Sequence, residues 1–188
     1  GLALDAEFRY LESSDEGNVT LDWLPNDRVA GRARGALQWQ HEGRWGRDVV
    51  YRADLARVSD QDWWKDFPSA ARSDTPRLLP MHAAVERSFA VTGGEGLLYA
   101  RTTHWQVLQA ADSLMASPYE RGPQLGLRVD AGAAGWRFAL ETEYNRFTLP
   151  QDQDRTQGRL VGSRLHLLGS LSHPWRAPGW WVVPKLSV

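Results

Sequence analysis

Apolar and polar side chains alternate with a period of two residues through most of the 188-residue chain. Between residues 2 and 11, for example, Leu, Leu, Ala, Phe and Tyr alternate with Ala, Asp, Glu and Arg. Successive side chains of a β-strand point to opposite faces, so this pattern predicts strands with one apolar and one polar face. A helix would mix the two sets, and the chain is therefore expected to be all-β.

The alternation predicts about ten strands. They are expected at residues 2–11, 18–23, 32–41, 49–58, 82–91, 97–108, 124–131, 136–146, 159–171 and 180–188. No stretch of about twelve residues combines apolar side chains at helical spacing with suitable caps, although residues 61–72 could form a short helical turn. The expected fold is an antiparallel up-and-down meander.

Short and long connections alternate from the third strand onward. Short turns are expected at residues 42–46, 92–96, 132–135 and 174–179. Longer connections, rich in Asp, Ser, Pro and Gln, are expected at residues 59–80, 109–123 and 149–157. Alternate connections of a meander emerge at opposite edges, so one edge should carry tight turns and the other long loops. This asymmetry is typical of outer-membrane barrels, although a soluble β-sandwich could also show it.

Aromatic side chains gather near both kinds of connection, and half of the 20 are Trp. Those beside the short turns are Trp45, Trp136, Trp175 and Trp180. Those in or near the longer connections are Trp63, Trp64, Phe67, Trp105, Tyr119, Tyr144 and Phe147. Membrane barrels place two such belts at their water interfaces. The alternative is that the rings are core residues at hairpin ends.

The hairpin around Gly94 indicates the character of the two faces. One register places Val91 opposite Leu97 and Phe89 opposite Tyr99 on an apolar face. The other face then carries His82, Ala84, Glu86 and Ser88 opposite Gln106, His104, Thr102 and Ala100. Such a polar face suits a water-filled lumen better than a dry core. This register also places Arg87 opposite Arg101 on the apolar face, which predicts either a slip in register or a position near the membrane border.

Charge and cysteine content exclude several classes of protein. The net charge is −1, from 22 basic and 23 acidic residues, so no basic field is available to hold nucleic acid. The absence of Cys excludes disulfides, thiolate metal sites and cysteine nucleophiles within the chain. The first residues do not form a signal peptide, and no apolar run is long enough for a membrane helix. We expect the chain to be a piece of a longer protein.

The side chains that could do chemistry form no recognisable motif. His41, His82, His104, His166 and His173 lack metal-ligand spacing, although the register above makes His82 and His104 diagonal neighbours. Carboxylates recur two residues apart at Asp5 and Glu7 and at Glu141 and Glu143, as a solvated strand face would place them. The sequence predicts no catalytic residue, metal or cofactor, and ligand-binding residues stay unassigned.

Several blocks follow one another in a recognisable order. They are residues 10–32, with Trp23-Leu24-Pro25-Asn26-Asp27-Arg28, and then 37–41, 57–67, 101–109, 118–125 and 141–147. These blocks resemble the early barrel region of LptD, the family of LPS-assembly proteins also called organic solvent tolerance proteins.

The resemblance implies a place in a larger assembly. Residues 1–188 would be early to middle strands of a large transmembrane barrel, without its periplasmic N-terminal domain and remaining strands. Such a barrel lies in the cell outer membrane, in contact with membrane lipid, and inserts lipopolysaccharide into the outer leaflet. Its implied partners are an LptE-like plug lipoprotein and the periplasmic Lpt bridge, and no catalysis is implied.

In such a wall the apolar face would contact lipid and the polar face would contact water. The lipid-facing residues would include Leu2, Leu4, Phe8, Leu125, Leu127, Phe138 and Leu140. The lumen-facing residues would include Asp5, Glu7, Arg9, Arg128, Glu141 and Glu143. Arginines on this face could contact anionic sugars and phosphates. Alternatives are a soluble Trp-rich β-sandwich that binds carbohydrate, the wall of an ordinary porin or ligand-gated transporter, and an outer-membrane hydrolase, for which no triad is evident.

Overall fold

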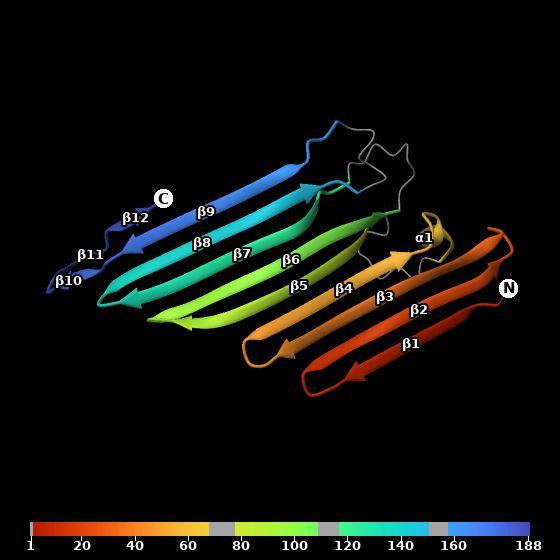
Figure 1. The fold of residues 1–188 in the computed structure, drawn as a ribbon, viewed down its shortest axis with the longest axis horizontal. Helices are drawn as coiled ribbons and strands as arrows, with labels where there is room; N and C mark the ends of the chain where they lie inside the picture. Colours follow the sequence, from red (N-terminus) through yellow and green to blue (C-terminus); the bar gives the residue numbers. More distant parts are fainter. Residues whose placement is uncertain (1, 68–77, 109–116, 151–157) are drawn as a thin grey trace.

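A computed structural model of the chain describes residues 2–67, 78–108, 117–150 and 158–188. Ten strands lie side by side in one antiparallel sheet, in the order β1 to β9 and then β12 (Figure 1). Their bounds are β1 (Leu4–Leu11), β2 (Asp15–Asp27), β3 (Arg32–Trp45), β4 (Val49–Val58), β5 (Leu78–Val91), β6 (Gly94–Val107), β7 (Glu120–Ala133), β8 (Trp136–Thr148), β9 (Gly162–Ser172) and β12 (Lys185–Ser187). The predicted all-β meander is confirmed.

The chain departs from the simple meander only at its end. The segment predicted as one strand over residues 180–188 is divided between β11 (Trp180–Val182) and β12, because Pro184 has no N–H to donate to a ladder. β11 pairs with β10 (Trp175–Ala177) in a separate two-stranded ribbon. The short turn predicted at residues 174–179 is therefore a hairpin of its own, attached to the end of β9.

The helical turn predicted within residues 61–72 is present as α1 (Trp63–Asp66). Residues 68–72 of that prediction lie outside the described residues. No helix in the described part of the chain is long and apolar enough to cross a membrane.

Tight turns and long connections lie at opposite ends of the strands (Figure 1). The turns of the β1–β2, β3–β4, β5–β6 and β7–β8 hairpins share one edge, which we call the tight-turn end. The β4–β5, β6–β7 and β8–β9 connections share the opposite edge, the long-connection end, with α1 beside it. The predicted asymmetry between the two edges is confirmed, although parts of the three long connections lie outside the described residues.

The register predicted for the β5–β6 hairpin is wrong. Its turn has only two residues, Thr92 and Gly93, because Gly93 adopts a φ of +66° that a tight hairpin turn requires. Ser88 therefore pairs with Leu97, and Phe89 pairs with Gly96 rather than Tyr99. Since the register differs by an odd number of residues, every side chain of β6 lies on the face opposite to the predicted one.

The predicted register placed both Arg87 and Arg101 on the apolar face, and the observed register removes one of the two from it. Arg101 lies on the polar face, where its guanidinium is 2.6 Å from the carboxylate of Glu86. Arg87 stays on the apolar face, opposite Leu98 and Val49. On β6 the polar face carries Leu97, Tyr99, Arg101 and Thr103 instead of the even-numbered residues that were predicted.

The two faces of the sheet differ in chemistry along its whole width. Directly paired residues project on the same side of a sheet, so the register carries each face from strand to strand. Large apolar side chains on one face have exposed fractions of 41–71%: Leu4, Phe8, Leu21, Trp23, Leu37, Val85, Leu98, Leu125, Phe138, Leu165, Leu167 and Leu171. We call this side the apolar face and the opposite side the polar face. Six of the seven residues predicted to face lipid lie on the apolar face, and exposed Leu2 precedes β1.

Cross-strand pairs of an aromatic ring and a glycine hold the register. In each pair the ring occupies the space that a Cβ atom on the opposite glycine would need. The pairs are Tyr10 with Gly17, Trp23 with Gly35, Tyr51 with Gly43, Phe89 with Gly96 and Tyr99 with Gly126. Each ring fits only opposite its own glycine, so slippage of one strand against the next would force a clash.

A compact apolar cluster exists at the long-connection end. Trp63 of α1 has an exposed fraction of 1% and packs with Ala36, Val58, Leu79 and Leu108. Ala36 and Val58 are directly paired on the polar face, so the segment after β4 folds over that face. The prediction that Trp63 belongs to an interfacial belt is wrong, because burial under this loop outweighs exposure at the rim. The side chain of Trp64 lies outside the described residues.

Candidate functional site

The polar face is the candidate functional site, because it gathers charged side chains from successive strands. One row across the sheet contains Arg9, Asn18, Gln40, Asp54 and His82, each directly paired with the next. The residues predicted to face water, Asp5, Glu7, Arg9, Arg128, Glu141 and Glu143, all lie on this face. The alternation in the sequence was sufficient to find them.

Opposite charges alternate across the middle of this face. The Arg52 guanidinium lies 2.9 Å from the Glu42 carboxylate of β3 and 3.8 Å from the Glu86 carboxylate of β5. Glu86 in turn contacts Arg101 of β6 at 2.6 Å. Positive and negative groups are thus interleaved over four strands. Arginine and carboxylate groups of this kind can form charge-assisted hydrogen bonds with the polar groups of a ligand.

Polar contacts continue the pattern toward the C-terminal strands. The Glu143 carboxylate accepts hydrogen bonds from the Tyr99 hydroxyl, from the Gln124 amide at 2.9 Å and from the Asn145 amide at 2.6 Å. These donors come from β6, β7 and β8, so the carboxylate connects three strands. The sequence analysis missed Tyr99 because the two-residue turn at Gly93 was not recognised.

A hollow of about 750 Å³ lies on the polar face over β1 to β5. Its polar lining residues include Arg9, Glu16, Gln40, Arg52, Asp54 and His82. With Glu42 as a further lining residue, two arginines and three carboxylates border the hollow, so charged groups of both signs are available to a solute that enters it.

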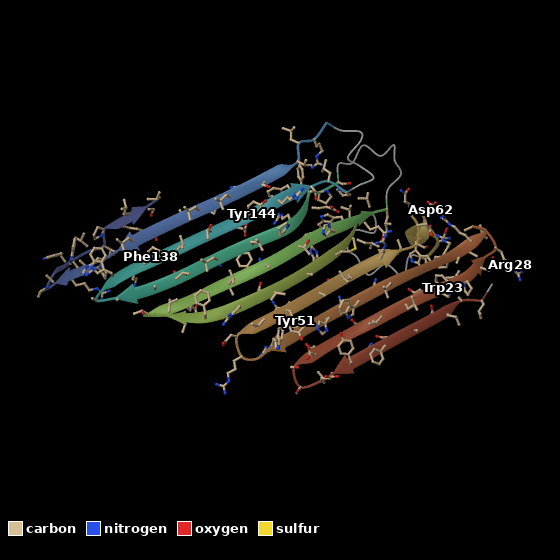
Figure 2. All side chains as sticks on the ribbon, viewed as in Figure 1. Trp23, Arg28, Tyr51, Asp62, Phe138 and Tyr144 are labelled. Carbon is tan, nitrogen blue, oxygen red and sulfur yellow. The ribbon has the colours of Figure 1, made fainter. Side chains whose placement is uncertain are left out.

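At the long-connection end, Arg34 connects the loop to the sheet. Its guanidinium lies 2.8 Å from Asp60, 3.0 Å from Asp27 and 2.7 Å from Asp66, and its own side chain is 4% exposed. The same group lies over the Trp63 ring, 5.6 Å from the ring centroid. The cluster therefore fixes α1 over the polar face. Figure 2 shows the neighbouring Asp62 at this end of the sheet.

Asp60, which lies in the loop after β4, is held as a carboxylate by this cluster. Burial raises the pKa of its carboxyl group, but hydrogen bonds from Arg34 and Ser59 outweigh that effect. The pKa of Asp60 consequently lies below the ordinary value of 3.8.

The histidines do not form a metal site among the described residues. His82 lies on the polar face and its Nδ1 is 3.1 Å from the Thr103 hydroxyl. His104 pairs with Met81 on the opposite face, so the prediction that the two histidines are neighbours on one face is wrong. Across the described residues, no group of three or more His, Cys, Asp or Glu side chains could hold a metal ion.

The apolar face carries a small polar cluster near the tight-turn end. The Tyr10 hydroxyl is hydrogen-bonded to His41 Nδ1 at 2.6 Å and accepts a hydrogen bond from Trp39 Nε1 at 3.1 Å. The Tyr51 hydroxyl donates to the Asp15 carboxylate. Figure 2 shows Tyr51 close to this end. Aromatic rings with polar tips suit the boundary between lipid and water.

Comparison with known proteins identifies the family of this two-faced sheet. A family model described as LptD, LPS transport system D, matches residues 32–188. The chain belongs to the LptD family. It is 34% identical over its whole length to an LPS-assembly protein LptD of Polaromonas sp.. Identity to the protein of the same name from Ralstonia nicotianae is 32% over 98% of the chain.

A third LptD relative, from Alkalilimnicola ehrlichii, is 33% identical over 93% of the chain. The chain spans 22–24% of the length of these relatives. The described residues form a segment of LptD-like sheet rather than a closed unit, since β1 and β12 each have only one neighbouring strand.

Proposed function

We propose that this chain forms early to middle strands in the wall of an outer-membrane barrel that moves lipopolysaccharide to the outer leaflet. The observation that carries the proposal is an LptD-family sequence folded as a single layer with one apolar and one polar face. In a membrane barrel the apolar face contacts lipid and the polar face lines the lumen. Lipopolysaccharide, with its phosphates and sugars, is chemically compatible with the arginine-rich and carboxylate-rich polar face.

The same arrangement supports proposals about partners. A plug lipoprotein of the LptE kind would contact the lumen and therefore the polar face. Periplasmic Lpt components would be reached from the tight-turn end, because membrane barrels carry short turns on their periplasmic side. The long-connection end, with α1 and the Arg34 cluster, would then face the cell exterior.

The carbohydrate-binding sandwich is not favoured. A sandwich packs two sheets face to face, whereas the described residues form one ten-stranded sheet and a two-stranded ribbon. Large apolar side chains on the outside of a soluble protein would also favour aggregation. The LptD family is one of transport and assembly proteins, so we propose no catalytic role for the chain.

Controlled depletion of the full-length protein in its source bacterium tests the proposal. We expect the protein in the outer-membrane fraction, at a size far above 21.2 kDa. On depletion, newly made lipopolysaccharide should fail to reach the cell surface. The measurement is the binding of an anti-lipopolysaccharide antibody added to intact cells. Re-expression of the full-length protein should restore the signal. Undiminished surface display after complete depletion would contradict the proposal.

A further inference from the structure

The apolar face has a hollow of about 600 Å³ over β4 to β6. Its lining includes three small side chains, Ala53, Ala83 and Ala100, which come from β4, β5 and β6 in turn. Ala53 pairs directly with Ala83, and Ala100 lies on the next paired row toward the tight-turn end. Elsewhere this face presents large side chains such as Leu125 and Phe138. The hollow is therefore a recess in a face that mostly carries larger residues.

Two rings that border the hollow, those of His41 and Tyr51, also contact an acidic group. The Tyr51 hydroxyl donates a hydrogen bond to the Asp15 carboxylate, and His41 Nε2 lies 3.7 Å from Asp15 Oδ1. The Asp15 side chain is 24% exposed, and a carboxylate has about four acceptor sites, so it can accept further hydrogen bonds. A carboxylate beside aromatic rings suits an ammonium group, which both attract.

Arg87 lies on the same face, between the hollow and the tight turns. It is exposed and follows two residues after Val85, which lines the hollow. In the sheet it pairs with Val49 and Leu98. A guanidinium group is costly within the hydrocarbon but can bind phosphate at the level of lipid headgroups. The tight-turn side of the hollow thus has a carboxylate from β2 and a guanidinium from β5.

This arrangement of charges matches a zwitterionic lipid. The apolar lining can take an acyl chain, while Asp15 and Arg87 can take an ammonium group and a phosphate. His104, at the other end of the hollow, already lies 3.2 Å from the Glu120 carboxylate. In the proposed orientation lipopolysaccharide goes to the outer leaflet, so a lipid at the periplasmic end is a phospholipid. Phosphatidylethanolamine has an ammonium group, whereas phosphatidylglycerol has none.

We propose that this hollow binds one phosphatidylethanolamine molecule of the periplasmic leaflet, with an acyl chain over Ala53, Ala83 and Ala100 and the ammonium group at Asp15. The inference rests on the proposed function, because it needs the apolar face to contact lipid and the tight-turn end to face the periplasm. Lipid that only surrounds a barrel wall exchanges without regard to its headgroup, whereas this site selects the headgroup by charge.

Native mass spectrometry of the full-length protein, equilibrated in detergent with equal amounts of phosphatidylethanolamine and phosphatidylglycerol, tests the inference. Asp15→Asn removes the carboxylate charge, and Asp5→Asn makes the same change on the polar face as a control. Ala83→Phe fills the hollow, and Ala6→Phe adds the same bulk to the apolar face of β1, outside the hollow. Heat-modifiable mobility in gels checks that each variant is folded.

We expect the unsubstituted protein to retain one phosphatidylethanolamine in preference to phosphatidylglycerol. Asp15→Asn should reduce this preference about tenfold, the effect of losing one hydrogen bond to a charged group, and Asp5→Asn should not change it. Ala83→Phe should abolish the preferred binding, and Ala6→Phe should preserve it. Survival of the preference in either Asp15→Asn or folded Ala83→Phe protein would overturn the site. A protein subunit or a second copy of the chain, bound in place of lipid and released by Ala83→Phe, would also overturn it.

The total amount of bound lipid separates this inference from the proposal on which it rests. If the protein lies in the outer-membrane fraction and binds both phospholipids equally, the wall stands and only the selective site fails. If the full-length protein binds neither phospholipid and is absent from that fraction, the proposed function fails and the site fails with it.

Discussion

The middle of the sheet and its long-connection end are stabilised in different ways. In the middle, a single layer of strands presents Leu125 and Leu167 on one side and the Arg52 and Glu86 pair on the other, and none of the described residues forms a second layer over either. At the long-connection end, the segment after β4 covers the polar face and buries Trp63 almost completely. The middle of the sheet needs an apolar medium on one face and water on the other, whereas the long-connection end contains a small core of its own.

The difference shows how a one-layer wall can remain folded. A sheet buries its hydrophobic surface against another layer in ordinary domains. The middle of this sheet lacks that layer in the described residues, so lipid on the apolar face would take its place. Where the loop covers the polar face, ordinary packing and buried ion pairs take over, and substitutions there should have effects typical of soluble proteins.

The largest effect is expected at Arg34. Replacing it with Ala leaves Asp60, whose side chain is 6% exposed, with only the more distant Arg32 guanidinium at 3.7 Å, and removes the charge over Trp63. Breaking a buried ion pair in this way costs about 3 kcal/mol. The cost should be local, as release of α1 from the polar face, and hydrogen exchange at the Phe67 amide should report it, since this amide donates to Trp63 O at 2.8 Å.

Arg52→Ala is the matched control for Arg34→Ala. The Arg52 and Glu42 side chains are 51% and 41% exposed, and exposed pairs contribute little to stability. Hydrogen exchange near position 52 should therefore change little. Similar acceleration of hydrogen exchange at both sites would contradict the contrast between the long-connection end and the middle of the sheet.

The next largest effect is expected from an Arg substitution on the apolar face in the middle of the sheet, compared with one on the polar face. Leu140 lies on the apolar face and Glu141 on the polar face of β8. Arg on the lipid side of a barrel costs about 2–4 kcal/mol near the bilayer midplane, so Leu140→Arg should reduce the fraction of full-length protein that assembles. Glu141→Arg should assemble more efficiently, although it replaces a contact with Arg128 at 3.4 Å by a repulsion.

Heat-modifiable mobility in gels of outer-membrane fractions measures both variants. Equal loss of the folded band in the two variants would contradict the assignment of the faces.

A smaller effect is expected where an aromatic ring covers a glycine. A Cβ atom at Gly126 would lie 2.0 Å from Cζ of Tyr99, so Gly126→Ala must displace the ring and its hydrogen bond to Glu143. Overpacking of this kind costs about 1–3 kcal/mol. The expected result is a lower urea midpoint for the detergent-solubilised protein. At Gly169 a Cβ meets nothing within 4 Å, so Gly169→Ala serves as the control. An unchanged midpoint for Gly126→Ala would indicate that these pairs do not hold the register.

The sequence predicted the faces well wherever alternation alone decides them. Leu4 and Glu7 on β1, like Leu140 and Glu141 on β8, lie as expected, because side chains of a strand alternate whatever its neighbours are. Alternation does not determine register. The pairing of Arg101 with Glu86 depends on whether the turn at Gly93 has two residues or more, and both choices leave the pattern within each strand unchanged.

The burial of Trp63 could not be predicted from the sequence either. The pattern around Trp63 is the same whether the loop after β4 points into solvent or folds over the polar face. Its burial depends on Arg34, which is 26 residues from Asp60 in the chain and whose role is evident only once β3 and β4 are paired. The same holds for the β10–β11 ribbon, where Pro184 was counted within a continuous strand.

The smallest effect expected is a pH dependence of the stability of the loop at the long-connection end. The pKa of Asp60 is lowered in the folded protein, so its ionised form stabilises the loop at pH values above the ordinary pKa of 3.8. This contribution should be lost as the pH falls from 3.8 through the lower folded value. It should be modest, because burial of the carboxyl opposes the hydrogen bonds from Arg34 and Ser59.

Hydrogen exchange at Phe67, divided by the intrinsic rate at each pH, should therefore accelerate in this acidic range. Asp60→Asn cannot ionise and should show a weaker dependence on pH, from a less protected starting value. If the substituted and unsubstituted proteins accelerate equally, the acid sensitivity belongs to other carboxylates and Asp60 is not what fixes α1 over the polar face.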